Sequence, residues 1–478
     1  MKLFAKAATV AALTLVAVVA VQAAPEIENV KPLEVSHNAF PGHKLTLTSR
    51  HDNPQSRVFK MHYGFLTTPQ NRKLFFWFFE SRNSPSTDPF VVWTNGGPGC
   101  SSLLGMFDEL GPCFVRTDDK TTALNPFSWN NNANILFIDQ PYGTGFSNYV
   151  GSGNRPVDSQ QSAADFGAFI QLFMKQFPQY ANLDFHITGE SYAGRYVPNM
   201  ASYVLNQTGS GIIKVNLKSI AIGNSLWDPL TQYKYYSAQA CHSPYPPILS
   251  TFQCDSIDRY YTNTCGPLIQ QCYDNPSNNT LCLHATDSCD DGIFGFDISP
   301  ASVYDIRVPH QKDPYRGDYE SYLQQSYVRT TLGVGSATYS ACSTIVNSYY
   351  INSGDWMRPY HTLIPQILAE NVRVLLYAGD ADYICNAIGN KAAAFALNWS
   401  GKSGFNAAPA NDWTVNGQKA GQSWAYQNFA FVTVYEAGHM IPENQPERAQ
   451  ALIQEWLKGN IVKLNDMSLS NDIDSWTF

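Results

Sequence analysis

The sequence predicts an α/β fold in which a mostly parallel central sheet is flanked by helices. Short apolar runs that end at Gly, Asn or Gln are typical of central strands, and they occur at 90–94, 135–139, 185–188 and 217–222. An apolar stripe at helical spacing lies between the second and third runs and indicates a buried helix face. Its members are Ala163, Phe166, Phe169, Ile170, Phe173 and Phe177. Alternation of strands with helices favours a parallel sheet.

Further elements follow along the chain. Runs 61–66 and 74–80 predict an antiparallel hairpin, and runs 372–377 and 429–434 predict two more buried strands. The stretch 228–345 breaks the alternation and is rich in Tyr, Pro and Cys. Because no Pro/Gly/Ser linker, repeat or low-complexity tract divides the 478 residues, one large core with an insertion fits better than several domains.

A serine lies in a sharp-turn motif after the third run. Gly189-Glu190-Ser191-Tyr192-Ala193-Gly194 follows the apolar run and precedes the helix-like residues 195–200. Strand, Gly-x-Ser-x-Gly, helix is the layout of a nucleophile elbow, in which the glycines let the backbone turn and present the hydroxyl. Such a serine needs a base, so the sequence must also supply a His and a carboxylate.

An acid and a histidine follow the ends of two later strands. The run 372–377 leads into Gly379-Asp380-Ala381-Asp382, and the run 429–434 leads into Gly438-His439-Met440. Reactive groups gather at the carboxyl ends of parallel strands, and the order Ser, Asp, His is that of α/β-hydrolases. The sequence therefore predicts an α/β-hydrolase fold with Ser191 as nucleophile and His439 as base. Asp382 and Asp380 are both candidates for the acid.

Five spaced motifs carry a family resemblance. They are Asn95-Gly96-Gly97-Pro98-Gly99-Cys100-Ser101-Ser102, Asp139 to Ser147, Gly189 to Gly194, Gly379 to Cys385, and Gly438-His439-Met440. Together they resemble the serine carboxypeptidases, the family that includes carboxypeptidase Y and cathepsin A. The resemblance implies a hydrolase core formed by residues 24–227 and 346–478, with 228–345 as an inserted, partly helical, disulfide-rich cap. It also places the acid at Asp382.

Two backbone donors are expected to stabilise the oxyanion that the attack creates. The elbow supplies the N–H of Tyr192, and a second N–H should come from a loop after an earlier strand, where Gly97 fits.

The resemblance also implies a site for the carboxylate of the substrate's last residue. It assigns this site to Asn95, Gly96, Glu109 and Glu190. Two acids that face a carboxylate cannot all stay ionised, so at least one pKa must rise, and we expect peptide binding to be tighter at acidic pH.

The pocket for the terminal residue is assigned in the same way, to Leu104, Asp108, Cys385 and Met440, while Tyr192 should border the preceding pocket. Asp108 departs from the apolar residue that is typical of members similar to carboxypeptidase Y. It either favours a terminal Lys or Arg by charge pairing or points to solvent.

The first residues predict export. A positively charged start, an apolar run over 7–21 and the small-residue site Val21-Gln22-Ala23 are typical of a signal peptide spanning 1–23. We expect a protein of the secretory pathway, secreted or vacuolar/lysosomal, without a membrane anchor. The net charge of −8 argues against nucleic acid and anionic membranes as partners.

Ten cysteines behind a signal peptide favour disulfides over a metal site, because no Cys-x2-Cys or zinc-like Cys/His spacing occurs. No metal or other cofactor is expected. Spacing leaves the connectivity open, and the resemblance implies the pairs Cys100–Cys342, Cys241–Cys254, Cys265–Cys289 and Cys272–Cys282. Cys385 is then a free thiol near the substrate, and Cys113 has no partner. Asn206, Asn278 and Asn398 begin glycosylation acceptor triplets.

The expected function is that of a serine carboxypeptidase, a monomer or homodimer that releases C-terminal amino acids from peptides and proteins through an acyl-enzyme. An acyltransferase or esterase on the same scaffold is the alternative, although Glu190 and Ala193 follow the peptidase form. A non-catalytic protective partner of other hydrolases is disfavoured by the intact Ser, Asp and His.

Overall fold

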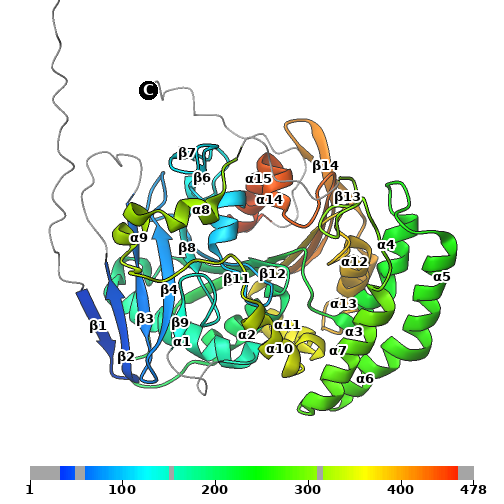
Figure 1. Cartoon of the computed structure of the whole chain (residues 1–478), viewed down its shortest axis with the longest axis horizontal. Helices are drawn as coiled ribbons and strands as arrows, with labels where there is room; N and C mark the ends of the chain where they lie inside the picture. The colour runs from blue at the N-terminus through cyan, green and yellow to red at the C-terminus, as the bar shows by residue number, and fades with distance from the viewer. Residues whose placement is uncertain (1–32, 49–59, 150–155, 309–315, 461–478) are drawn as a thin grey trace, which may run out of the picture. The chain divides into compact units, whose positions relative to one another are not determined.

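The computed structural model describes residues 33–48, 60–149, 156–308 and 316–460 (Figure 1). The predicted signal peptide, 1–23, lies outside the described residues. Within these ranges, no helix is both long and apolar enough to cross a bilayer.

One large mixed sheet organises the described chain. Its path is β1-β2-β3-β4-β8-β5-β10-β11-β12-β15-β14-β13, with β9 paired to β4. The strands are β1 (Leu33–His37), β2 (Phe40–Leu47), β3 (Met61–Thr67), β4 (Arg72–Phe79), β5 (Phe90–Thr94), β8 (Asn134–Ile138), β9 (Asn148–Tyr149), β10 (Asp184–Glu190), β11 (Asn216–Gly223), β12 (Arg373–Gly379), β13 (Asn411–Val415), β14 (Gln418–Tyr426) and β15 (Phe429–Val434). A separate hairpin joins β6 (Cys113–Val115) to β7 (Thr122–Leu124).

The six central strands, from β8 to β15, all run parallel, and both flanks are antiparallel. The predicted α/β fold is confirmed, and every predicted central strand lies in this parallel part. The edge strands β1, β2, β13 and β14 were not predicted from the sequence. Their alternation of exposed and buried positions is interrupted, so that period 2 is weak there.

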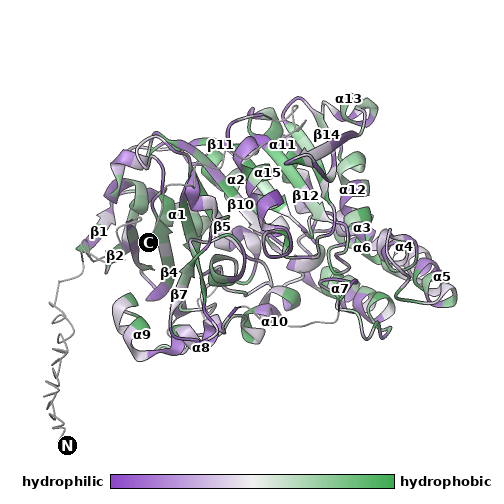
Figure 2. Cartoon of the chain, turned by 90° about the horizontal axis from the view of Figure 1, so that it is seen from above, coloured by the Kyte–Doolittle hydropathy of each residue, from purple (hydrophilic) through white to green (hydrophobic). Residues whose placement is uncertain are grey.

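Helices cover both faces of the sheet, which is why the central strands are apolar throughout (Figure 2). On one face, Phe76 and Phe78 of β4 pack against Phe173 of helix α1 (Ser159–Gln176). On the other face, alternate strand residues pack with Trp456 of helix α15 (Pro446–Leu457). The predicted apolar stripe therefore lies on α1, whose first turn is capped by the side chain of Asp158.

Further helices of the core are α2 (Ala193–Asn206), α10 (Thr344–Asn352), α11 (Leu363–Ala369), α12 (Ala387–Ala396), α13 (Lys402–Ala407) and α14 (Ile441–Asn444). Short helical turns lie at Gly105–Glu109, Trp129–Asn131, Pro178–Tyr180, Asp355–Met357 and Tyr360–Thr362.

The described part of segment 228–345 is helical and contributes no strand to the sheet. Its helices are α3 (Pro229–Gln232), α4 (Tyr236–His242), α5 (Thr251–Tyr260), α6 (Gly266–Asp274), α7 (Asn279–Ile293), α8 (Tyr319–Gln324) and α9 (Ser326–Leu332), with turns at Tyr233–Tyr235 and Tyr261–Cys265. The disulfide Cys241–Cys254 links α4 to α5, and Cys265–Cys289 and Cys272–Cys282 link α7 to the turn before α6 and to α6 itself. Helices α4, α5, α6 and α7 lie side by side in Figure 1. The residue boundaries of this cap stay a prediction.

Candidate active site

Ser191 lies on a strained turn between β10 and α2. Its φ is +65°, a left-handed conformation that costs a non-glycine residue about 1–3 kcal/mol. Its N–H donates to the carbonyls of Gly223 and Asn224, both at 3.1 Å. A Cβ on Gly189 would lie 2.6 Å from the Thr94 carbonyl oxygen, so only glycine lets β10 approach its neighbour this closely. The predicted elbow layout is therefore present.

His439 and Asp382 form a buried hydrogen-bonded pair. The distance from His439 Nδ1 to Asp382 Oδ2 is 2.8 Å, and the two side chains are 5% and 0% exposed. Because an ionised carboxylate only accepts, Nδ1 carries the proton and Nε2 is left as the basic nitrogen. The rival acid, Asp380, instead accepts a hydrogen bond from the Tyr245 hydroxyl at 2.6 Å. The geometry thus favours Asp382 as the acid.

Ser191 and His439 reach the same edge of the sheet, since β10, β11, β12 and β15 are parallel neighbours. The buried Cys385 is close to both residues. Its sulfur lies within 4.8 Å of a His439 ring nitrogen, and the Ser191 side chain acts against the burial that raises the pKa of its thiol. No hydrogen bond joins Ser191 to His439 in the described chain; such bonds are often long until substrate is bound.

Asn224 holds the acid Asp382 by a hydrogen bond, a contact that was not predicted from the sequence. Its Nδ2 donates to Asp382 Oδ2 at 2.7 Å, while its Oδ1 accepts from the Gly379 N–H at 3.1 Å. The residue has φ +37° and is fully buried. Nothing in the sequence separates this asparagine from other residues that follow a strand, because its role depends on a contact 158 positions away.

Replacing Asn224 by Gly is expected to lower kcat about 10- to 100-fold, because a hydrogen bond to a charged group contributes about 1.5–3 kcal/mol. Glycine is the informative replacement since it tolerates the positive φ. Steady-state kinetics on a peptide checks this, with the melting temperature as the control for folding. An unchanged kcat would show that the backbone alone holds Asp382.

Two backbone N–H groups, those of Gly97 and Tyr192, belong to loops that meet at the elbow. Gly97 has φ +108°, and neither its N–H nor that of Tyr192 finds an acceptor in the described part of the chain. A Cβ on Gly96 would lie 2.3 Å from the Tyr192 nitrogen, so the two loops touch. Disulfide Cys100–Cys342 and the hydrogen bond from Ser101 to Asp139 fix the glycine-rich loop. This places two preorganised donors near Ser191.

Glu109 and Glu190 meet beneath Asn95. The Asn95 amide donates to Glu109 Oε1 at 3.1 Å and to Glu190 Oε1 at 3.4 Å, and all three side chains are at most 4% exposed. Burial raises the pKa of Glu190 well above its ordinary value, and the Glu109 charge raises it further. Burial also raises the pKa of Glu109. Two carboxylates that are buried side by side repel each other when both are charged, which is the physical reason that the Glu109 charge raises the pKa of Glu190.

The other predicted pocket residues differ in burial, and their role in a pocket stays a prediction. Leu104, Asp108 and Met440 are half-buried, and Cys385 is 5% exposed. Burial raises the pKa of the Cys385 thiol well above its usual value. Arg316 donates to the backbone carbonyl of Asp108.

Two aromatic residues were missed by the sequence analysis. The Tyr304 ring lies 5.3 Å from the His439 ring, and its carbonyl accepts the His439 N–H at 2.7 Å. The Trp356 ring lies 5.2 Å from that of Tyr192. Only packing distinguishes them from the many other aromatic residues of the chain.

Three side chains of types that can bind a metal ion, Asp382, Cys385 and His439, lie close together at this site. Their potential ligand atoms are within 4.8 Å of one another. The hydrogen bond between Asp382 and His439 accounts for two of them as an acid–base pair. The absence of a resident metal stays a prediction from the sequence.

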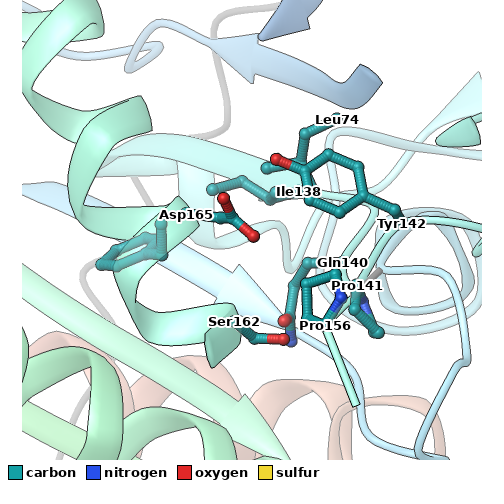
Figure 3. A pocket seen from close by; sticks show the side chains of 9 residues that line it. Leu74, Ile138, Gln140, Pro141, Tyr142, Pro156, Ser162 and Asp165 are labelled. Atoms are coloured by element: carbon teal, nitrogen blue, oxygen red, sulfur yellow. The ribbon is translucent and has the colours of Figure 1, made fainter. Parts of the chain in front are cut away.

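A cavity of about 10 Å³ lies elsewhere, beside α1 (Figure 3). Leu74, Ile138, Tyr142 and Asp165 are among the side chains around it, and none of the candidate site residues lines it. Burial raises the pKa of Asp165 to about 6, although Arg72 lies 3.1 Å away. The cavity has room for about one water molecule.

Comparison with known proteins identifies the family. The family model for serine carboxypeptidases matches residues 52–459. The chain belongs to the serine carboxypeptidase family. The predicted family and enzyme class are thereby confirmed.

Two similar relatives come from fungi. Carboxypeptidase Y of Schizosaccharomyces pombe is 43% identical over 448 residues, which cover 89% of this chain and 44% of the relative. Carboxypeptidase Y homolog A of Chaetomium globosum is 44% identical over 412 residues, covering 84% and 72%. The chain thus spans less than half of the first protein and nearly three quarters of the second.

A solved structure supports the fold of this serine carboxypeptidase. The crystal structure of Kex1(delta)p, a prohormone-processing carboxypeptidase from Saccharomyces cerevisiae, matches with a TM-score of 0.71 and 25% identity, covering 89% of this chain and 95% of that chain.

The four disulfides are those that the resemblance implied, and Cys113 and Cys385 are free thiols. Cys113 is half-buried on β6, and burial raises its pKa to about 11, so it is a poor nucleophile. The three glycosylation candidates, Asn206, Asn278 and Asn398, are all exposed.

Proposed function

We propose that the chain releases C-terminal amino acids from peptides through an acyl-enzyme, with Ser191 as nucleophile. The observation that carries this is the buried pair Glu109 and Glu190, both bonded to Asn95, with Glu190 one residue before Ser191. A hydrolase that cleaves inside a chain has no need of such a carboxylate-binding site beside its serine.

Each group has a step. His439 Nε2 takes the proton of the Ser191 hydroxyl as the oxygen attacks the last peptide carbonyl, and Asp382 stabilises the imidazolium. The N–H groups of Gly97 and Tyr192 hold the oxyanion. When the C–N bond breaks, His439 returns the proton to the departing amino acid. Water then attacks the acyl-enzyme, with His439 again as base.

The carboxylate site selects the substrate's end. Asn95 and the Gly96 N–H donate to the terminal carboxylate, and the proton shared by Glu109 and Glu190 supplies a further donor. Binding is therefore expected to weaken as the pH rises and that proton leaves.

A peptide library tests this proposal. The purified protein is incubated at several pH values, beside Ser191→Ala, and products are read by mass spectrometry. Stepwise loss of single C-terminal residues supports the proposal, and internal cleavage contradicts it. Acyl transfer to a small alcohol without amino acid release would favour the acyltransferase or esterase alternative.

The Asp108 side chain tests terminal-residue preference. If it faces the substrate, replacing Asp108 by Phe should lower the ratio of kcat/KM for peptides ending in Lys over those ending in Leu by about tenfold, the effect of about 1.4 kcal/mol. Kinetics on two matched peptides measures the ratio. An unchanged ratio would show that Asp108 does not select a terminal Lys or Arg by charge pairing.

We also propose a place in the secretory pathway, either vacuolar/lysosomal or secreted. Four disulfides persist in oxidising compartments, and the acceptor asparagines are exposed. The Asn278 side chain caps α7 through Oδ1, which leaves Nδ2 free for a glycan.

A further inference from the structure

We infer that Asp355 is a positioning residue for the oxyanion hole. Its buried carboxylate holds the side chain of Tyr192, and through it the Tyr192 N–H. This inference rests on the proposed function, in which that N–H stabilises the oxyanion.

Asp355 is fully buried, and both of its oxygens are occupied. Oδ2 accepts from the Tyr192 hydroxyl at 2.5 Å and from the Ser159 hydroxyl at 2.6 Å. Oδ1 accepts from the Ser159 N–H at 3.0 Å, the Tyr360 hydroxyl at 2.5 Å and Arg358 Nη1 at 3.5 Å. A carboxylate offers about four lone-pair directions, so these donors leave it no freedom to turn.

This carboxylate joins three segments that are distant in sequence. Ser159 starts α1, Tyr192 follows the nucleophile, and Tyr360 begins the turn before α11. Tyr192 and Asp355 are 163 positions apart. The elbow is therefore tied to the fold at a point outside β10 and α2.

The Asp355 carboxylate holds Tyr192, the residue whose N–H is the proposed oxyanion donor. Tyr192 is the N-cap of α2, with φ −59° and ψ −12°, and it directly follows the strained Ser191. Its ring is packed by Tyr196 and Trp356, each with a centroid 5.2 Å away. With the ring packed and its hydroxyl bonded, the peptide plane before Tyr192 has little room to rotate. Misplacement by about 1 Å costs about 100-fold in rate.

A merely structural role makes a different prediction. If Asp355 only stabilises the fold, loss of any of its bonds should lower the melting temperature and leave kcat alone. Ser159→Ala is the matched control, since it removes a hydroxyl bond to the same Oδ2 without touching the elbow.

The test compares Tyr192→Phe, Asp355→Asn, their double variant and Ser159→Ala on one peptide. We expect kcat to fall about 10- to 100-fold in the first two, with KM within about threefold, because transition-state binding is lost while ground-state binding remains. The double variant should have the same kcat as Asp355→Asn, because the two single substitutions remove the same hydrogen bond between Tyr192 and Asp355. Ser159→Ala should lose melting temperature and keep its kcat.

An unchanged kcat in Tyr192→Phe overturns the inference, even where Asp355→Asn fails to fold. Additive losses in the double variant also overturn it. If Ser191→Ala keeps full activity, the proposed function fails instead, and that outcome is separate because it does not depend on Asp355.

Discussion

Ser191→Ala is expected to lower kcat for peptide cleavage by about a million-fold, the loss seen when a triad nucleophile is removed. The hydroxyl lies on the strained elbow, and no other serine in the described ranges has a positive φ. Peptide affinity should stay near that of the parent, because Asn95, Glu109 and Glu190 are untouched. Burst-phase kinetics and equilibrium binding to the variant measure the two quantities.

A second variant, His439→Ala, tests whether the loss of activity reflects the loss of the reacting groups and not unfolding. His439→Ala should cost about as much as Ser191→Ala, and the double variant should cost little more, since groups that act as a unit are non-additive. Equal melting temperatures show that folding is intact. Residual activity within about tenfold of the parent in Ser191→Ala would place the nucleophile elsewhere.

Glu190→Gln is expected to flatten the pH dependence of peptide binding. In the parent, burial and the Glu109 charge raise the pKa of Glu190, so the shared proton is held at acidic pH and lost as pH rises. Losing a hydrogen bond to the substrate carboxylate then raises KM about 10- to 100-fold, from about 1.5–3 kcal/mol. Glutamine always donates, so the variant should keep a low KM at alkaline pH.

The pH dependence of the melting temperature reports on the raised pKa of Glu190 without any substrate. A carboxyl group with a raised folded pKa stabilises the fold fully below its unfolded value of 4.5, and this stability is lost as pH rises towards the folded pKa. Glu190→Gln should therefore raise the melting temperature at pH 7 and have little effect at pH 4.

Glu370→Gln is the matched control, because this glutamate is exposed at the end of α11. It should change neither KM nor the pH profile of the melting temperature. Identical pH profiles of KM in Glu190→Gln and the parent would mean that the pair does not bind the substrate carboxylate.

The central strands were predictable because each is buried on both faces. A continuous apolar run bounded by turn residues identifies β5, β8 and β11 without knowledge of their neighbours. Pairing extends β10 as far as Glu190, beyond the apolar run that marks it. The edge strands were not predicted, because one of their faces is polar and their alternation of apolar and polar residues is irregular.

The candidate site divides in the same way. Ser191, Asp382 and His439 could be named because each follows a strand in a motif of fixed local spacing. Asn224, Tyr304 and Asp355 could not, because each acts through a contact with a residue more than 130 positions away. Local spacing carries no information about such pairs.

By itself, the sequence determined the family, the order of the central strands along the chain and the types of the reacting groups, since these depend on short motifs and apolar periodicity. Only the tertiary structure showed that His439 forms its hydrogen bond with Asp382, the acid that the resemblance indicated, and that two buried glutamates both accept from Asn95. Hydrogen bonds and pKa values depend on distance and burial in space, and the parallel sheet creates both by bringing strand ends together.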